Sequence, residues 1–172
     1  CGFDNINTDL IAGLPTDTTE SFKNSLDSIV RLNAECITVH TLCMKRASRL
    51  TTEGVTLDLQ QARDAREMLA YTQNILGQNE YIPYYMYRQS RMVGNLENVG
   101  WSKRGFESLY NVYVMDETHT ILACGSGGVT KLKRNNPDYL ERIFNFKYPY
   151  EYIDRFDELI QRKSGIMQFY GQ

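Results

Sequence analysis

The sequence predicts a mixed chain, with an α/β unit at its start and an α+β region after it. Two apolar, strand-like segments at 6–14 and 36–42 flank an amphipathic segment, all within about 40 residues. This strand–helix–strand order predicts two parallel strands joined by a right-handed crossover, a βαβ unit. Because parallel sheets bury both faces and seldom have only two strands, we expect the unit to be the end of a larger parallel barrel or sheet whose earlier strands are absent from this chain.

Each element of the βαβ unit has a local signal. Residues 6–14 form a short apolar run that is typical of a buried strand. Asp17 and Glu20 have the three-residue spacing of a capping box, which predicts a helix with Asp17 as its N-cap. Apolar residues continue at helical spacing to about Asn33. The β-branched run 36–42 then predicts the second strand.

A turn-rich stretch at 47–55 separates this unit from the second region. In the second region, helices are predicted from apolar residues spaced three and four apart, and strands from β-branched and aromatic runs bounded by turn residues. The predicted elements are a helix over 58–77, a strand over 84–88, a loop or irregular helix over 95–105, a β-hairpin of 109–115 with 119–124, a strand over 141–147 and a helix over 150–163.

The composition is that of a globular protein and excludes several classes. The chain has 172 residues, 42% hydrophobic and 23% charged. Lys and Arg number 19 and Asp and Glu 21, so the net charge of −2 does not indicate a nucleic-acid binder. No apolar run approaches the roughly 18 residues that a membrane span needs. The chain starts at Cys1 without a methionine or a signal peptide, and we expect it to be a piece of a longer protein.

The cysteines, at positions 1, 36, 43 and 124, form no CxxC pair. This spacing is typical of reduced thiols and predicts a cytoplasmic protein. Cys36, His40 and Cys43 resemble a metal-ligand set. On one strand, however, Cys36 and His40 would be about 13 Å apart, since a strand rises roughly 3.3 Å per residue. A zinc ion bound at about 2.0–2.3 Å cannot span that distance, so core packing is favoured and no metal site is predicted.

Asp9 and the glycine-rich segment Cys124–Val129 are candidate ligand-binding features. A carboxylate within an apolar strand is costly unless it has a partner, and ligands of parallel α/β proteins collect at the carboxyl ends of strands. Asp9 therefore either contacts a ligand or is satisfied by neighbouring backbone. The glycines allow close approach to a ligand, but no helix-forming sequence follows them, which excludes a dinucleotide fingerprint. A close-approach loop and a plain turn both stay open.

Basic residues gather in two segments, one after the second predicted strand and one between positions 84 and 104. Fixed cations suit a ligand with several carboxylates, because arginine binds a carboxylate through two parallel hydrogen bonds. An ordinary solvated surface is the alternative. The residues are Lys45, Arg46, Arg49, Arg88, Arg91, Lys103 and Arg104.

Several motifs together resemble a known family. The segment Asn7-Thr-Asp-Leu-Ile-Ala-Gly-Leu-Pro15 is similar to the DLIxGLP segment of the oxygen-independent coproporphyrinogen III oxidases (dehydrogenases), a radical S-adenosylmethionine (SAM) family. The blocks Tyr84-Tyr-Met-Tyr-Arg-Gln89 and Met92-Val-Gly-Asn-Leu-Glu-Asn-Val-Gly100 are similar to its HemZ-type branch, as is Glu107-Ser-Leu-Tyr-Asn111. The resemblance extends over essentially the whole chain.

The resemblance implies a six-stranded partial (β/α) barrel followed by a C-terminal α+β domain. Residues 1–46 would then be the end of the radical-SAM barrel, with its last two strands, and residues 47–172 the C-terminal domain. The family binds a 4Fe–4S cluster through a CxxxCxxC motif, which this chain lacks. The glycine-rich motif for the methionyl end of SAM is missing as well. The cluster ligands are therefore expected in the parent protein and not in this chain.

The resemblance also implies an activity for the parent protein. In the family, a reduced cluster splits SAM, and the 5′-deoxyadenosyl radical takes a hydrogen from a propionate of coproporphyrinogen III. Loss of carbon dioxide then leaves a vinyl group, a step of haem biosynthesis that also needs an electron acceptor, unknown here. The substrate would be a tetrapyrrole, and the chain alone is expected to be inactive.

Three family positions that contact SAM match residues of this chain. Asp9 matches the aspartate of the DLI motif, Cys43 a small residue that contacts SAM through its backbone, and Val129 an apolar residue near the adenosyl group. Contact of Arg88 and Arg91 with the substrate propionates is our own inference from their charge.

Two further expectations follow. Some relatives of the family are haem-binding chaperones without oxidase activity, and this chain is alternatively a segment of such a protein, with His40, His119, a tyrosine or a methionine as haem ligand. In addition, the strand over 6–14 would lack a neighbour on one side without the earlier barrel strands. An open edge invites association, so we expect either a homodimer through this strand or poor anchoring of residues 1–45.

Overall fold

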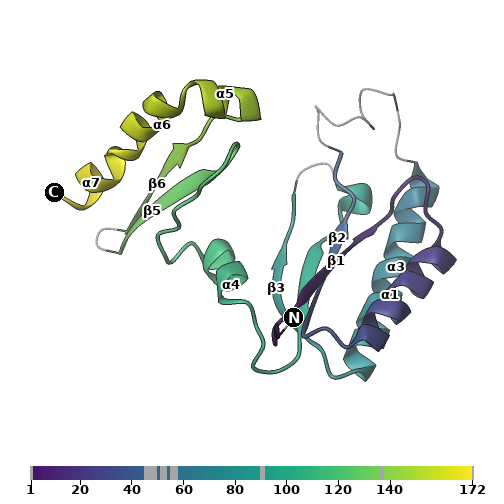
Figure 1. Ribbon diagram of the computed structural model, residues 1–172. Helices are drawn as coiled ribbons and strands as arrows, with labels where there is room; N and C mark the ends of the chain where they lie inside the picture. Colours follow the sequence, from purple (N-terminus) through teal and green to yellow (C-terminus); the bar gives the residue numbers. More distant parts are fainter. Residues whose placement is uncertain are drawn as a thin grey trace. The chain divides into compact units, whose positions relative to one another are not determined.

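A computed structural model describes residues 2–44, 50, 54, 58–89, 92–135 and 138–171 of the chain. They fall into two compact units, Cys1–Ser108 and Leu109–Gln172, and each is described here by itself (Figure 1). The compact units divide at 108/109, whereas the boundary predicted from the family lies at 46/47. The predicted turn-rich stretch at 47–55 lies almost entirely outside the described residues.

The first unit is a four-stranded mixed sheet covered by helices on one face (Figure 1). Its strands, in the order β1-β2-β4-β3, are β1 (Asn7–Ala12), β2 (Cys36–Thr41), β4 (Asn98–Ser102) and β3 (Ile82–Tyr87). The predicted pairing of the first two strands is confirmed, because β1 and β2 are parallel with Asp9 opposite Thr38. β4 is antiparallel to both β2 and β3.

Helices α1 (Thr19–Leu32) and α3 (Leu59–Gln78) supply the cover. A single core joins Phe22 and Leu26 of α1 to Met68 of α3 and to Ile37 and Val39 of β2. Alternate residues of each strand point to this core. No helix in the described residues of the first unit covers the other face of the sheet (Figure 1). The short 3-10 helix η1 (Val93–Asn95) connects β3 to β4 and packs against α3.

The ends of the helices are set by local hydrogen bonds. α3 begins at the predicted capping box, in which the Asp58 carboxylate accepts from the backbone of Gln61 and the Gln61 side chain accepts from the backbone of Asp58. α1 is capped one residue later than predicted: Thr18 is the N-cap, and its hydroxyl accepts from the backbone N–H of Ser21.

The prediction of a loop over 95–105 is wrong, because β4 lies there in the middle of the sheet. Its glycine content suggested a loop, but Gly100 lies inside the strand, where the absence of a side chain lets the Tyr85 ring pack against the backbone. A Cβ atom at this position would fall within the ring of Tyr85. Asn98 fits its buried position because its side-chain oxygen accepts from the Thr41 backbone N–H at 2.7 Å.

The second unit contains α4 (Leu109–Asp116), the hairpin β5 (Val129–Asn135) with β6 (Asp138–Phe144), and three short helices: α5 (Pro149–Asp154), α6 (Phe156–Lys163) and α7 (Gly165–Tyr170). Its buried residues include Leu132, Phe146 and Leu159. None of the helices in the described parts of either unit is long and apolar enough to cross a membrane.

The predicted hairpin of 109–115 with 119–124 is wrong. Its first half is the helix α4, and its second half makes only one bridge, from Ile121 to Lys131 of β5. The turn signal at 116–118 is real but ends a helix, since Glu117 has a left-handed backbone (φ 51) and its N–H donates to Tyr113 O at 3.2 Å. None of the residues of α4 is buried, so burial does not select its conformation.

The predicted strand over 141–147 is present as β6, which begins three residues earlier. The predicted closing helix over 150–163 is present but interrupted at Arg155. There the guanidinium groups of Arg155 and Arg162 both lie 4.1 Å from the centre of the Phe146 ring. Cation–π contacts of this kind hold the broken helix against the unit.

Candidate functional site

The face of the first sheet that the helices leave open carries most of its polar side chains. Asp9 on β1, His40 on β2 and Tyr87 on β3 all project from it, and we call this surface the open face. Register places them there, because Asp9 is opposite Thr38, Thr38 is opposite Gly100, and Gly100 is opposite Tyr85. Side chains of paired residues share a face of a sheet.

Asp9 has two polar neighbours and remains accessible. The side-chain amide of Asn7 donates to Asp9 Oδ1 at 2.7 Å, and Nε2 of His40 lies 3.7 Å from Asp9 Oδ2. The Asp9 side chain is 58% exposed, so it avoids the cost of burial that the sequence pattern suggested. Leu10 and Ala12 of β1 face the helices instead, and Asp9 is available to a ligand on the open face, which it shares with the exposed Ile11.

Tyr87 contacts His40, the neighbour of Asp9. Its hydroxyl lies 3.2 Å from His40 Nδ1, which extends the contact between His40 and Asp9 into a chain across three strands. Burial raises the pKa of the Tyr87 hydroxyl. The side chain of Asn98 opposes that shift, and the charges of Asp9 and Cys43 add to it.

Tyr85 covers the centre of the open face. Its hydroxyl is 3.1 Å from the Thr38 hydroxyl, and its ring lies over Gly100. The rings of Tyr85 and Tyr87 stack, with an angle of 10° between their planes. Burial raises the pKa of the Tyr85 hydroxyl as well, which keeps both phenols in their neutral form near pH 7.

Cys43 follows β2, and its backbone forms an isolated antiparallel β-bridge with that of Met92. It does not gather with Cys36 and His40, because the Cys36 thiol is buried and donates to the carbonyl oxygen of Phe106 at 3.0 Å. Burial also raises the pKa of the Cys36 thiol, which keeps it protonated. Within the described part of the chain, no three His, Cys, Asp or Glu side chains are placed to hold a metal ion.

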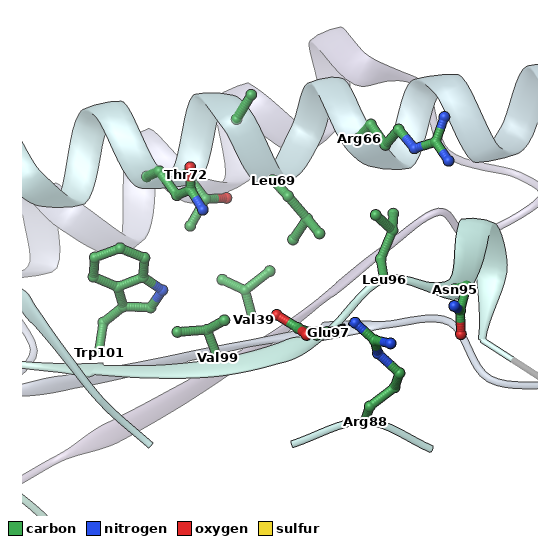
Figure 2. Close-up of a pocket in the computed structure, with 12 residues that line it drawn as sticks. Val39, Arg66, Leu69, Thr72, Arg88, Asn95, Leu96, Glu97, Val99 and Trp101 are labelled. Carbon is green, nitrogen blue, oxygen red and sulfur yellow. Dashed lines mark hydrogen bonds and ion pairs between the residues drawn. The ribbon is translucent and has the colours of Figure 1, made fainter. Parts of the chain in front are cut away.

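Two of the predicted basic residues, Arg88 and Lys103, have partners away from Asp9. Arg88 lies on the helix side of the sheet, where its guanidinium pairs with Glu97 at 2.6 Å (Figure 2). Lys103 donates to the carbonyl and side-chain oxygens of Asn33 and thereby caps the end of α1. Arg91, Lys45, Arg46 and Arg49 lie outside the described residues.

Val129 is the first residue of β5 in the second unit, directly after the glycine turn. Asn145 holds this turn, since its amide nitrogen donates to the carbonyl oxygen of Gly125 at 2.7 Å. A Cβ atom on Gly128 would meet the Cys124 carbonyl oxygen at 3.0 Å, so the turn needs glycine there. The side-chain oxygen of Asn145 is buried and accepts no hydrogen bond from the described residues. Such an orphaned acceptor is uncommon in folded proteins.

Sequence reasoning missed the roles of His40, Tyr85, Tyr87 and Asn145. The sequence offers His40 as a metal or haem ligand and a tyrosine as a haem ligand, but it places neither beside Asp9. The alternation Tyr85-x-Tyr87 was a usable signal, because residues two apart on a strand share a face. Asn145 had no local signal, since its unpaired oxygen is a property of the folded turn.

Comparisons with known proteins agree with the motif resemblance. The chain is 37% identical over 167 residues to the oxygen-independent coproporphyrinogen-III oxidase-like protein HemZ of Bacillus subtilis (strain 168), covering 97% of this chain and 33% of that protein. The structure is similar to that of coproporphyrinogen III oxidase (HemN) from Escherichia coli, described as a radical SAM enzyme, with a TM-score of 0.58 and 17% identity. That match covers 91% of this chain and 35% of HemN. No family model matches the chain.

These matches confirm the resemblance to the HemZ-type branch and show a fold shared with HemN. The chain spans about a third of the length of each of these two proteins.

Proposed function

We propose that this chain is the C-terminal segment of a radical SAM enzyme that oxidatively decarboxylates the propionates of coproporphyrinogen III in haem biosynthesis. The observation that carries the proposal is the 37% identity to HemZ over 97% of the chain. The open face supports it, because an accessible carboxylate lies there among aromatic and polar groups. The complete protein would work in the cytoplasm with an electron acceptor whose identity is open.

The βαβ unit would be the end of the partial barrel, with residues 1–46 in the barrel and 47–172 in the C-terminal domain. This boundary stays a prediction, because the compact units divide at 108/109 and β3 and β4 continue the sheet of β1 and β2. Helices cover only one face of the sheet, as on the outside of a barrel, so the open face would line its interior (Figure 1). Asp9 would then face the cavity of the complete enzyme.

The residues present fit a nucleoside such as SAM at Asp9, which offers exposed carboxylate oxygens to hydrogen-bond donors. SAM supplies the group that abstracts hydrogen from the substrate. In this proposal Asp9 accepts hydrogen bonds from SAM, Cys43 contacts it through backbone, and Val129 packs near its adenosyl part. His40 and Tyr87 act as positioning residues that hold the Asp9 carboxylate.

The residues present do not fit a 4Fe–4S cluster. The sequence has no CxxxCxxC motif, and Cys36 is buried in a hydrogen bond to backbone. We therefore assign the cluster to the remainder of the complete protein and expect no turnover from this chain alone.

Binding of the substrate propionates by Arg88 and Arg91 stays a prediction. Arg88 is paired with Glu97 on the helix side of the sheet, which does not favour a role beside Asp9. Substitution of Arg88 by Gln in the complete protein would test it, since a propionate contact predicts weaker substrate binding with unchanged SAM binding.

The first test is the substitution D9A in the complete protein. A hydrogen-bonded carboxylate contributes about 1–3 kcal/mol, so the affinity for SAM should fall by roughly one to two orders of magnitude. Isothermal titration with SAM measures the change. D64A is the matched control, because Asp64 lies on α3 on the other side of the sheet and accepts a hydrogen bond from Gln60 of the same helix. Equal SAM affinities for the D9A and D64A variants would show that Asp9 does not contact SAM.

The second test separates the enzyme from the haem-binding chaperone. The complete protein, reconstituted anaerobically with iron and sulfide, should form 5′-deoxyadenosine and a divinyl porphyrin. Tight haem binding without decarboxylation would favour the chaperone. No described contact favours that alternative, since His40 contacts Tyr87 and His119 lies 3.9 Å from the ring of Tyr113.

A further inference from the structure

A cavity of about 320 Å³ lies between α3 and the helix-side face of β2 and β4 (Figure 2). Its volume is within the range of small-molecule sites. Because it lies on the side of the sheet opposite Asp9, it is separate from the proposed SAM site. It is lined by Val39, Arg66, Leu69, Ala70, Thr72, Gln73, Arg88, Asn95, Leu96, Glu97, Val99 and Trp101.

The two ends of the cavity differ in chemistry. Val99 and Trp101 form an apolar end, whereas Arg66, Arg88 and Asn95 stand at the other end (Figure 2). The charge of Arg88 is balanced by Glu97, to which it is paired. Arg66 forms no hydrogen bond or ion pair with any residue in the described ranges. The polar end therefore carries one uncompensated positive charge.

The cavity is elongated. Arg66 and Gln73 both line it, and seven residues of helix correspond to about 10 Å. It adjoins a second cavity of about 460 Å³, which shares Gln73, Glu97, Val99 and Trp101 with it and is also lined by residues 83–86 of β3. An occupant can therefore be longer than the first cavity.

We propose that this cavity binds an organic anion with an elongated apolar body, its carboxylate at Arg66 and its apolar part against Trp101. A guanidinium group binds a carboxylate through charge-assisted hydrogen bonds, and covering Val39, Leu69 and Val99 removes apolar surface from water. A strongly polar ligand would find partners in Gln73 and Asn95 but would leave the apolar walls without apolar contact. A neutral apolar ligand would leave the charge of Arg66 unmatched.

The protein carries its own reporter for this test. Trp101 is the only tryptophan of the 172 residues and forms the apolar end of the cavity, so its fluorescence reports occupancy. The probes are decanoate and decanol, which share a chain and differ in charge. Decanoate should change the fluorescence saturably. R66Q should weaken the binding of decanoate about tenfold and leave that of decanol unchanged.

R63Q is the matched control, because Arg63 lies one turn earlier on α3 and does not line this cavity. A70F tests the position independently of charge, since the added ring at the exposed Ala70 would block both probes. Near-ultraviolet circular dichroism verifies that each variant is folded. The proposal fails if decanoate gives no saturable change, if R63Q and R66Q lose affinity equally, if A70F binds as well as the unchanged chain, or if the signal follows self-association of the chain instead of the probe.

Discussion

At the scale of single residues, Gly100 and Tyr85 show how a close contact shapes the open face. The ring of Tyr85 occupies the space where any side chain at position 100 would begin, and its hydroxyl reaches Thr38 at 3.1 Å. Glycine at this position is therefore a packing requirement, although its backbone is an ordinary strand. The same ring position places Tyr85 parallel to Tyr87, which contacts His40.

We expect G100A to destabilise the chain by about 1–3 kcal/mol, because the Tyr85 ring must leave its position and its bond to Thr38 is lost. Urea unfolding measures the change. In a double-mutant cycle with Y85A the two effects should not add, since removing the ring removes the clash.

G77A is the matched control for this prediction. Gly77 lies in α3 with open space where a Cβ atom would be, so alanine there should stabilise the chain by about 0.5–1 kcal/mol. If G100A were as well tolerated as G77A, the ring of Tyr85 would not lie over position 100.

At the scale of secondary-structure elements, caps fix where the helices begin and end. α1 begins after Thr18 and ends at Asn33, whose left-handed backbone (φ 62) returns its N–H to Val30 O. Asp17 also contributes, since its carboxylate accepts from the backbone N–H of Thr18 at 2.9 Å. Two neighbouring residues thus have capping chemistry, and only one of them bonds a free N–H of the first turn of the helix.

We expect T18A to cost about 1 kcal/mol of stability, because the N–H of Ser21 loses its acceptor. D17A should cost less, and T18S should keep nearly full stability because it retains the hydroxyl. Thermal or urea unfolding of the three variants measures the order. A larger loss for D17A than for T18A would identify Asp17 as the N-cap.

At the scale of the whole molecule, β1 is an edge strand. It pairs with β2 on one side, and no strand in the described residues pairs with its other side. The N–H groups of Cys36 and Leu42 donate to the carbonyl oxygens of Ile6 and Ala12. Successive residues of a strand direct their N–H and C=O groups to opposite sides, so those of Ile11 point away from β2, toward the open edge. In the proposed barrel, this edge would receive the preceding strand.

We expect the 172-residue chain to self-associate through this edge, and I11P to reduce the association. Proline at an outward-facing edge position removes a donor without breaking the bonds to β2, so the stability of the monomer should change little. Sedimentation velocity at increasing concentration measures the association. I11V, which keeps the N–H, is the control. A chain that stays monomeric at all concentrations, or I11P and I11V variants that associate alike, would contradict this prediction.

The amino-acid sequence was sufficient for features that depend on neighbours along the chain. The periods of apolar residues and the capping residues gave β1, α1, β2 and α3, because helix and strand periods and caps are local. The sequence motifs likewise indicated the similarity to HemZ-type proteins that the comparison with HemZ confirms. β4 was not predicted, since a glycine-rich segment takes its conformation from what packs on it, here the ring of Tyr85 over Gly100. α4 was not predicted either, because its β-branched and aromatic residues are typical of a strand.

Side-chain placement needed the folded molecule. Asp9, His40 and Tyr87 come from three strands, and only the register of those strands brings them into contact. Similarly, Arg88 was predicted as a ligand-binding cation, but the sheet turns it to the helix side, where it meets Glu97. The physical reason is the twofold alternation of a strand: a shift of one residue moves a side chain to the opposite face, and long-range pairing sets that register.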